Sequence, residues 1–283
     1  MHLQLPGFDA SETNARRLTT RAPSNTKERR QKAVVPDKVH RGKTEASESG
    51  SWRPGILAIA DKAARGYALV MQHENNCAPP TVMLANGAFP THAVPLAVLR
   101  AAKRIVCCDG AAEKLLAAGF TPTAIVGDLD SLPDTLRQRF ADRLVREPGQ
   151  NDNDLSKAFR FCLQKGWGKI VILGATGLRE DHTLGNLALL ADFATQADVK
   201  MLTDAGVFFA LHQTATFATF PGQPVSVFSF DPQTAITSDG LQYHLVNLKL
   251  TRWWQATLNA ATGDSATLTF SGGPPLVFQA HPA

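Results

Sequence analysis

The sequence predicts an α/β fold: a parallel sheet with helices on both faces, then a small C-terminal antiparallel β-sandwich, with a disordered N-terminal arm before them. Between residues 81 and 211, short and continuously apolar runs alternate with amphipathic stretches, as expected for parallel strands buried on both faces. Beyond residue 211, shorter segments alternate apolar and polar residues, which is typical of antiparallel strands. We therefore divide the chain into an arm (1–80), an α/β domain (81–211) and a β-sandwich (212–283).

The arm is predicted to be disordered because Arg, Lys, Ser, Thr, Glu and Pro dominate it and its hydrophobic spacing is irregular. It carries 13 of the 29 Lys and Arg residues but only 8 of the 25 Asp and Glu residues. The sequence pI of about 8.9 therefore describes the arm and not the globular part. We expect no nucleic-acid partner on this ground.

The arm does not have the sequence pattern of a secretory or organellar targeting signal. It has no early apolar core, as a secretory signal has, and it is too acidic for an organellar transit peptide. No apolar run is long enough to span a bilayer, so we expect no membrane association. Cys77, Cys107, Cys108 and Cys162 form no Cys-x-x-Cys pair, which favours a reducing compartment. The sequence thus predicts a cytoplasmic protein.

The α/β domain is predicted element by element from its hydrophobic spacing. Apolar runs predict strands at 81–85, 105–108, 124–126, 143–146, 169–173 and 199–202. Helical spacing predicts helices at 95–103, 111–118, 132–141, 154–165 and 181–194. In the β-sandwich, strands are predicted at 214–220, 225–230, 245–251, 266–270 and 276–279.

The segment Gly127-Asp128-Leu129-Asp130-Ser131 follows one of these strands. Ligands of open α/β sheets bind outside the carboxyl ends of the strands. In an extended backbone, Asp128 and Asp130 project the same way, and two such carboxylates repel unless a cation lies between them. Mg²⁺ suits this arrangement. The alternative is a solvated turn in which Ser131 or Asp130 caps the next helix.

Polar residues follow other strands of the same sheet. Asn86-Gly87 is a turn signal, and Asp109-Gly110 places a carboxylate at a helix N-terminus, where Asp109 is alternatively a simple N-cap. Asp154 and Lys157 lie three residues apart on one helix face, so that Asp154 suits Mg²⁺ and Lys157 suits phosphate. The alternative is that this segment is only a capped, solvated helix start.

The segment 174–183 joins a strand to a helix. Its glycines offer backbone N–H groups to phosphate, and Arg179 offers a bidentate fork. The spacing of a P-loop is absent. Taken singly, Asp181 is as well explained as a helix cap, and His182 as a surface residue.

Together these segments resemble the thiamine pyrophosphokinase (thiamine diphosphokinase) family, from about residue 81 to the C-terminus. The resemblance is carried by the order and spacing of five motifs: Asn86-Gly87, Asp109-Gly110-Ala111, Gly127-Asp128-Leu129-Asp130-Ser131, Asn153-Asp154-Leu155-Ser156-Lys157-Ala158 and Arg179-Glu180-Asp181-His182-Thr183-Leu184-Gly185-Asn186. Asn151 and Asn153 stand where some relatives have an acid or Thr.

The resemblance implies ATP-dependent transfer of a whole pyrophosphoryl group to the hydroxyl of thiamine, with release of AMP. It implies that the α/β domain is catalytic and binds ATP and Mg²⁺, and that the sandwich binds thiamine in a homodimer with sites near the interface. Asp128, Asp130 and Asp154 are then the catalytic and Mg²⁺-binding acids, and Asp128 or Asp130 takes the hydroxyl proton. The residues implied on the nucleotide and phosphate side are Asn86, Asp109, Gly110, Lys157, Arg179, Asp181, His182 and Thr183.

Thiamine-side segments are implied at 240–245 and 258–261, which include Tyr243 and Asn259. Leu258 stands where the family leads us to expect Ser. Trp253 or Trp254 offers a ring face to the cationic thiazolium. If the pair lies in an alternating strand, one of the two points into the core, so at most one stacks on substrate.

Two alternative functions remain open from the sequence. One is a different nucleotide-dependent phosphotransferase on a related frame. The other is a non-catalytic nucleotide-binding module, against which the retention of every acid in the set argues. The nucleotide product separates these hypotheses: AMP for pyrophosphoryl transfer, ADP for another phosphotransferase, and none for a binding module.

Overall fold

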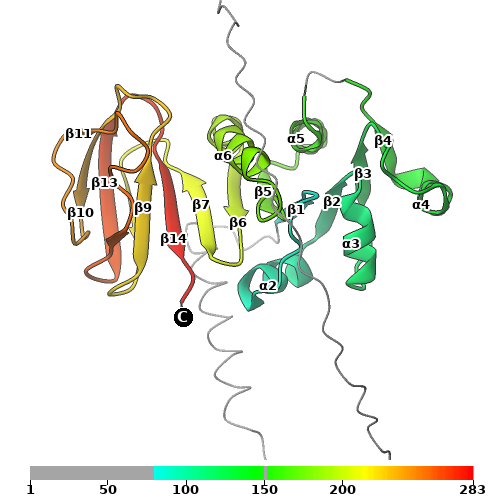
Figure 1. Ribbon diagram of the computed structural model, residues 1–283, viewed down its shortest axis with the longest axis horizontal. Helices are drawn as coiled ribbons and strands as arrows, with labels where there is room; N and C mark the ends of the chain where they lie inside the picture. Colours follow the sequence, from blue (N-terminus) through cyan, green and yellow to red (C-terminus); the bar gives the residue numbers. More distant parts are fainter. Residues whose placement is uncertain (1–79, 150–151, 283) are drawn as a thin grey trace, which may run out of the picture. The chain divides into compact units, whose positions relative to one another are not determined.

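The computed structural model describes residues 80–149 and 152–282, so the predicted disordered arm lies outside the described residues except for Pro80. From residue 80 to residue 203, strands and helices alternate as predicted (Figure 1, cyan to yellow-green). The strands are β1 (Thr81–Leu84), β2 (Arg104–Cys108), β3 (Ala124–Gly127), β4 (Leu144–Arg146), β5 (Lys169–Leu173) and β6 (Asp198–Leu202). The helices are α2 (Ala93–Ala101), α3 (Ala111–Ala117), α4 (Asp134–Arg139), the 3₁₀ turn η1 (Ala141–Arg143), α5 (Asp154–Gln164) and α6 (Glu180–Ala194).

These six strands are parallel neighbours in the order β4-β3-β2-β1-β5-β6. Strand β1 therefore has β2 on one side and β5, which comes much later in the chain, on the other. Beside β1 the strand order reverses. In open α/β sheets, the crevice at the carboxyl ends of such strands is where ligands bind.

Helices cover both faces of this sheet, as the α/β prediction requires. Val82 and Leu84 of β1 belong to the core that includes α2 and α3. Met83 and Ala85, the alternate positions, belong to the core that includes α5 and α6. Because successive side chains of a strand point to opposite faces, each strand contributes to two cores. This double burial explains why the strands read as continuous apolar runs.

The C-terminal strands are antiparallel (Figure 1, yellow to red). They are β7 (Gly206–Ala210), β8 (Ala215–Ala218), β9 (Pro224–Phe228), β10 (Ala235–Asp239), β11 (Leu248–Lys249), β12 (Asn259–Ala260), β13 (Ser265–Ser271) and β14 (Leu276–Ala280). Four of them continue the first sheet, which thereby has ten strands in the order β12-β9-β14-β7-β6-β5-β1-β2-β3-β4. The other four form a second sheet, β11-β10-β13-β8.

The two sheets pack as the predicted sandwich. Val227 and Val277 of the ten-stranded sheet share one core with Phe217, Ile236 and Leu268 of the four-stranded sheet. All five predicted strands of this region are present, although most are shorter than predicted. Strands β7, β10 and β12 were not predicted. Strand β7 pairs antiparallel with β6, so one hydrogen-bonded layer runs from the parallel part into the sandwich.

Trp253 and Trp254 lie outside the strands of the described residues, so the condition under which one of them would point into the core is not met. The two residues lie in a turn, and their exposed fractions are 50% and 68%, so neither is a core residue. The Trp253 ring instead meets the ring of Phe230 edge to face, with centroids 5.3 Å apart. As to membranes, the described helices include none that combines the length and apolar character needed to cross a bilayer.

Candidate active site

The turns that follow β1 and β5 are joined at the carboxyl edge of the sheet. The amide of Gly87 donates to the carbonyl oxygen of Gly174 (2.6 Å), and the amide of Ala88 donates to that of Thr176 (2.8 Å). A Cβ atom at Gly87 would lie 2.3 Å from the Gly174 oxygen and 2.6 Å from the Thr176 oxygen. Only glycine permits this approach, which explains why a turn glycine follows Asn86.

Lys114 of α3 fastens the same turn, and sequence reasoning missed it. Its Nζ atom donates to the carbonyl oxygens of Gly87 (2.7 Å) and Asn86 (3.0 Å). Burial lowers the pKa of this ammonium, because the charged form loses solvation. A lysine on an amphipathic helix ordinarily reads as a solvated residue, so its sequence context carries no signal for this role.

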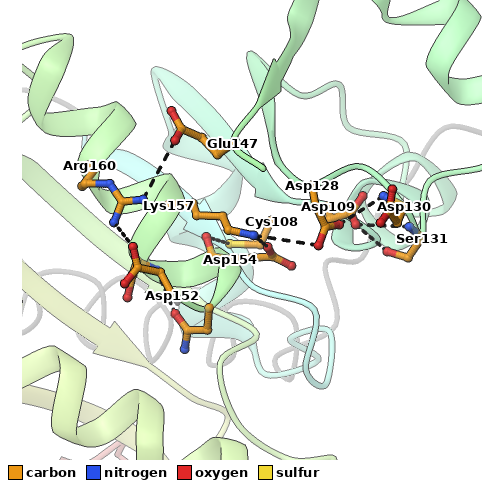
Figure 2. A network of polar contacts seen from close by, with 12 residues as sticks. Cys108, Asp109, Asp128, Asp130, Ser131, Glu147, Asp152, Asp154, Lys157 and Arg160 are labelled. Carbon is orange, nitrogen blue, oxygen red and sulfur yellow. Dashed lines mark hydrogen bonds and ion pairs between the residues drawn. The ribbon is translucent and has the colours of Figure 1, made fainter. Parts of the chain in front are cut away.

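The loop after β3 is bent and not extended, so the prediction of an extended backbone between Asp128 and Asp130 is wrong. Leu129 has a φ of 68°, which costs roughly 1–3 kcal/mol in a non-glycine residue. The amide of Asp130 donates to Oδ1 of Asp128 (3.1 Å), and the Arg137 guanidinium donates to the Leu129 carbonyl (2.6 Å). Asp128 is half-buried and Asp130 is exposed. Both residues belong to one polar network, Asp128 through its carboxylate and Asp130 through its backbone amide (Figure 2).

Asp109, which follows β2, is the buried member of this network, with an exposed fraction of 3%. Its Oδ2 accepts hydrogen bonds from the hydroxyl (2.6 Å) and the amide (3.4 Å) of Ser131. Its Oδ1 is buried and has no hydrogen-bond partner among the described residues. Burial raises the pKa of Asp109, and the nearby Asp154 and Asp128 raise it further, against the hydrogen bonds from Ser131. The alternative interpretation of Asp109 as the N-cap of α3 is wrong, because the N-cap is Gly110.

Asp154 and Lys157 lie on one face of α5, as predicted. The side chain of Asn153 accepts from the amide of Ser156 (2.9 Å) and so begins the helix at Asp154. The Nζ atom of Lys157 lies 3.0 Å from Oδ1 of Asp154 and 3.9 Å from Oδ2 of Asp128. Lys157 is only 3% exposed, and these two carboxylates pair with its buried ammonium.

Gly127 lets the acids approach one another. A Cβ atom at Gly127 would lie 2.9 Å from Cβ of Asp109 and 3.4 Å from Oδ1 of Asp154. Any larger residue would push apart side chains from β2 and α5. Among the described residues, no three Asp, Glu, His or Cys side chains are positioned to hold a metal ion by themselves. The acids are gathered, but a cation here needs further oxygen ligands.

A cavity of about 310 Å³ lies beside the acids and above the strand-order reversal. The predicted residues that line it are Asn86, Asp154, Arg179 and His182. Residues that sequence reasoning missed also line it, among them Cys108, Asn153, Leu178 and Asn186. The side-chain Nδ2 of Asn186 donates to the Ala175 carbonyl (2.8 Å), and its Oδ1 accepts from the side-chain Nδ2 of Asn153 (3.3 Å). These bonds connect α6 to the residue that begins α5. Asn186 could have been predicted as a lining residue, because it is the last residue of the final motif.

The remaining predicted residues of this group lie around the start of α6. Arg179 and Asp181 are exposed and pair with each other, with Nη2 2.5 Å from Oδ2. The hydrogen bond from Arg179 lowers the pKa of the Asp181 carboxyl. Asp181 does not line the cavity, whereas Thr183 lines a second cavity nearby. Gly110 lies against Asn86, whose Nδ2 would be 2.7 Å from a Cβ atom there.

The predicted thiamine-side residues lie at the other end of the ten-stranded sheet. Asn259 of β12 is buried, and its side chain bonds both the amide (2.9 Å) and the carbonyl (2.7 Å) of Tyr243. Tyr243 itself is 62% exposed. Strand β12 is six positions from β1 in the sheet, roughly 30 Å at the usual strand spacing. A single chain therefore does not bring Tyr243, Trp253, Trp254 or Asn259 to the acids.

Comparisons with known proteins agree with the arrangement of both halves. Residues 96–203 match the family model described as thiamin pyrophosphokinase, catalytic domain, and residues 206–278 match thiamin pyrophosphokinase, substrate-binding domain. Thiamin pyrophosphokinase 1 of Caenorhabditis elegans is 30% identical over 166 residues, which cover 53% of this chain and 67% of that protein. Thiamine pyrophosphokinase 1 of rice (Oryza sativa subsp. japonica) is 27% identical over 221 residues, 68% of this chain and 78% of that protein.

Solved structures share the fold. A thiamin pyrophosphokinase family protein from Enterococcus faecalis superposes with a TM-score of 0.62 at 22% identity, covering 72% of this chain and 100% of that one. Thiamin pyrophosphokinase from Candida albicans gives a TM-score of 0.59 at 17% identity, covering 71% and 89%. With both family models matched in order, and with the predicted motifs gathered at one sheet edge, the chain belongs to the thiamin pyrophosphokinase family.

Proposed function

We propose that the protein transfers the pyrophosphoryl group of ATP to the hydroxyl of thiamine, giving thiamine diphosphate and AMP, at the carboxyl edge of the parallel sheet. The observation that carries the proposal is the convergence of Asp109, Asp128 and Asp154 near the buried ammonium of Lys157, beside a cavity. Family membership supports the reaction, and this convergence supports its place.

Mg²⁺ is proposed to be held by Asp128, Asp130 and Asp154, with ATP phosphates and water as further ligands. The donor set fits, because Mg²⁺ takes oxygen ligands and is commonly bound by one or two carboxylates plus substrate phosphates. The orphaned Oδ1 of Asp109 and the raised pKa of that carboxyl indicate a place where positive charge would relieve repulsion. When bound, the ion neutralises charge on the phosphates during transfer.

Two cationic side chains of the protein, Lys157 and Arg179, are proposed to interact with the phosphates. Lys157 holds a fixed positive charge between Asp154 and Asp128, where it can balance charge that develops on phosphate oxygens. Arg179 is exposed and paired with Asp181, and its planar fork fits a phosphate as well as a carboxylate. Asn86 and His182 line the cavity beside them. The carboxylate of Asp128 or Asp130 is proposed to accept the hydroxyl proton of thiamine.

A homodimer is proposed to complete the site. The exposed large apolar residues of the sandwich are Phe230, Tyr243, Val246, Trp253, Trp254 and Leu258, all between residues 230 and 258. A second group, Leu178 and Leu184, is exposed at the start of α6 beside the cavity. Because six strand positions separate β12 from β1, the sandwich of one protomer reaches the acids only of a partner. Thiamine would then bind between the two.

Mixing two inactive variants tests this interface. Asp128→Asn removes an acid, and Trp254→Ala removes an exposed ring. If each site combines the acids of one protomer with the sandwich of the other, the mixed dimer contains one intact site, and activity returns after the two are unfolded and refolded together. If each site lies within one chain, the mixture stays inactive. The Trp254→Ala protein refolded alone is the baseline.

The reaction itself is tested with the full-length protein, ATP, Mg²⁺ and thiamine. We expect AMP and thiamine diphosphate in equal amounts. ADP as the nucleotide product would identify a different phosphotransferase, and ATP binding without turnover would identify a non-catalytic module. We also propose a cytoplasmic location, supported by three free and buried cysteines, Cys107, Cys108 and Cys162, among the described residues.

A further inference from the structure

The loop that carries Asp128 and Asp130 is held by one side chain of the helix that follows it. Arg137 lies in α4 and is half-buried. Its Nε donates to the carbonyl oxygen of Leu132 (2.9 Å), and its Nη2 donates to those of Leu129 (2.6 Å) and Asp130 (3.3 Å). The planar guanidinium presents several N–H donors at fixed angles. It therefore fixes the direction of three carbonyl groups of this loop at once.

Two of these carbonyls belong to peptide groups whose N–H donates to an acid of the site (Figure 2). In a planar trans peptide, the C=O and N–H bonds point in opposite directions. The Leu129 carbonyl shares its peptide group with the amide of Asp130, which donates to Oδ1 of Asp128 (3.1 Å). The Asp130 carbonyl shares its peptide group with the amide of Ser131, which donates to Oδ2 of Asp109 (3.4 Å). Each peptide group thus lies between the guanidinium and a carboxylate.

The orientation of these peptide groups depends on an unusual backbone. Leu129 has a φ of 68°, in the left-handed region that leucine ordinarily avoids. A change to a negative φ would rotate the peptide group between Leu129 and Asp130 and turn its N–H away from Asp128. Hydrogen bonds from a charged donor are about twice as strong as neutral ones, so Arg137 is a strong restraint on this conformation. Its ion pair with the exposed Asp134 is long (3.8 Å) and contributes little.

We propose that Arg137 is a positioning residue for the reaction, which orients the carboxylates of Asp128 and Asp109 through the two peptide groups. The proposal rests on the proposed function and adds the residue that sets the geometry of its acids. Arg137 reaches the acids only through the backbone of the loop, so it acts on the reaction through them. Groups that orient metal-binding side chains in this way typically contribute roughly 10- to 100-fold to metal affinity or activity.

Amide hydrogen exchange in the full-length protein, without metal or nucleotide, tests the orientation of the peptide groups. Arg137→Met removes all three donated hydrogen bonds, and Arg137→Lys keeps the charge without the planar fork. Arg139→Met, at an exposed position of the same helix, is the matched control. We expect the amides of Asp130 and Ser131 to exchange about tenfold faster in Arg137→Met, the scale of one lost hydrogen bond, while the amides of β3 keep their protection. Arg137→Lys should give a smaller increase and Arg139→Met none.

Steady-state kinetics then measures the consequence for the reaction. We expect kcat for AMP formation to fall roughly 10- to 100-fold in Arg137→Met, and the Mg²⁺ concentration that gives half the maximal rate to rise, while KM for thiamine stays the same. Arg137→Lys should lie between this variant and the unaltered protein, and Arg139→Met should match the unaltered protein. A role in folding alone would lower the thermal midpoint of Arg137→Met and leave kcat and the Mg²⁺ dependence of the folded protein as they are.

Unchanged exchange of the Asp130 and Ser131 amides in Arg137→Met, or faster exchange with unaltered kcat and Mg²⁺ dependence, would overturn the proposal. If Arg137→Met does not fold, the same measurements are made on Arg137→Lys, and values equal to those of the unaltered protein would overturn it. If the unaltered protein forms no AMP, the proposed function fails. The exchange measurement, which needs no substrate, still decides in that case whether Arg137 orients these amides.

Discussion

The ammonium nitrogen of Lys157 lies 3.0 Å from the carboxylate of Asp154, one turn earlier on α5, and the lysine is enclosed by protein. Lys157→Met removes a fixed charge from the proposed phosphate site and leaves the acids to repel one another. We expect a fall in kcat/KM of at least about 100-fold, the effect typical of removing one preorganised donor. We also expect unfolding free energy to fall by about 1–3 kcal/mol.

The measurements for Lys157→Met are AMP formation and thermal unfolding with and without Mg²⁺. The divalent ion should stabilise the variant more than the unaltered protein, because it replaces the lost positive charge. Lys165→Met, at the exposed end of the same helix, should change neither quantity. An Mg²⁺ effect on stability that is identical in the variant and the unaltered protein would argue against a shared cation position.

Asp128→Asn is expected to abolish turnover with little change in folding stability. The side chain is half-buried at the sheet edge and not in a core, and its loss relieves repulsion with the acids beside it. AMP formation and the thermal midpoint are the readouts. Asp134→Asn is the control, since its side chain is 88% exposed on α4. Normal turnover by the Asp128→Asn protein would show that the metal assignment is wrong.

Lys114→Met is expected to raise KM for ATP about tenfold and to change kcat less, since the lysine positions a turn and does not touch the reacting atoms. Its two hydrogen bonds hold the Asn86–Gly87 turn, which is in turn bonded to the segment after β5. Lys103→Met removes an exposed lysine just before β2, at the other edge of the sheet, and should leave KM unchanged. Steady-state kinetics at saturating thiamine checks this, and an unchanged KM in Lys114→Met contradicts it.

His281 predicts a dependence of stability on pH. Burial lowers the pKa of this imidazole, against the hydrogen bond with the Thr203 carbonyl (2.9 Å) and the charge of Asp204, and the stacked His92 ring adds to the lowering. A lowered folded-state pKa means that the unfolded chain binds the proton first. Stability is therefore complete above the ordinary histidine pKa of about 6.5 and is lost as pH falls below it, by at most about 1.4 kcal/mol per pH unit.

Thermal unfolding between pH 7.5 and 5 measures this loss. His281→Gln should flatten the dependence, whereas His244→Gln, at an exposed position, should leave the slope as it is. A slope that is the same in all three proteins would exclude His281 as its source.

The sequence was sufficient for the parallel half of the fold, because double burial leaves an unmistakable apolar run for each strand. It was also sufficient to gather Asp128, Asp154 and Lys157, since residues that follow neighbouring parallel strands meet at one edge. The left-handed backbone of Leu129 was not predictable, because a leucine ordinarily avoids it. The Arg137 side chain donates hydrogen bonds to the carbonyls of Leu132 and Leu129 and so holds this loop, a contact that hydrophobic spacing does not reveal.

The antiparallel half was less predictable, for two reasons. Strand β7 is a continuous apolar run like the parallel strands, and only its partners β6 and β14 reveal its direction. Strand β12 contains only Asn259 and Ala260, too few residues to show a period.

The antiparallel pairing of β6 with β7 also determines how this protein can be divided. The two family regions meet between residues 203 and 206, inside the hairpin that joins these strands. Chain cleavage there would leave both pieces with a long unpaired strand edge, the kind of surface through which polypeptides aggregate. A chimera of two distant relatives would have to recreate the pairing of β6 with β7 residue by residue. The two regions are therefore expected to be inherited and expressed only as one unit.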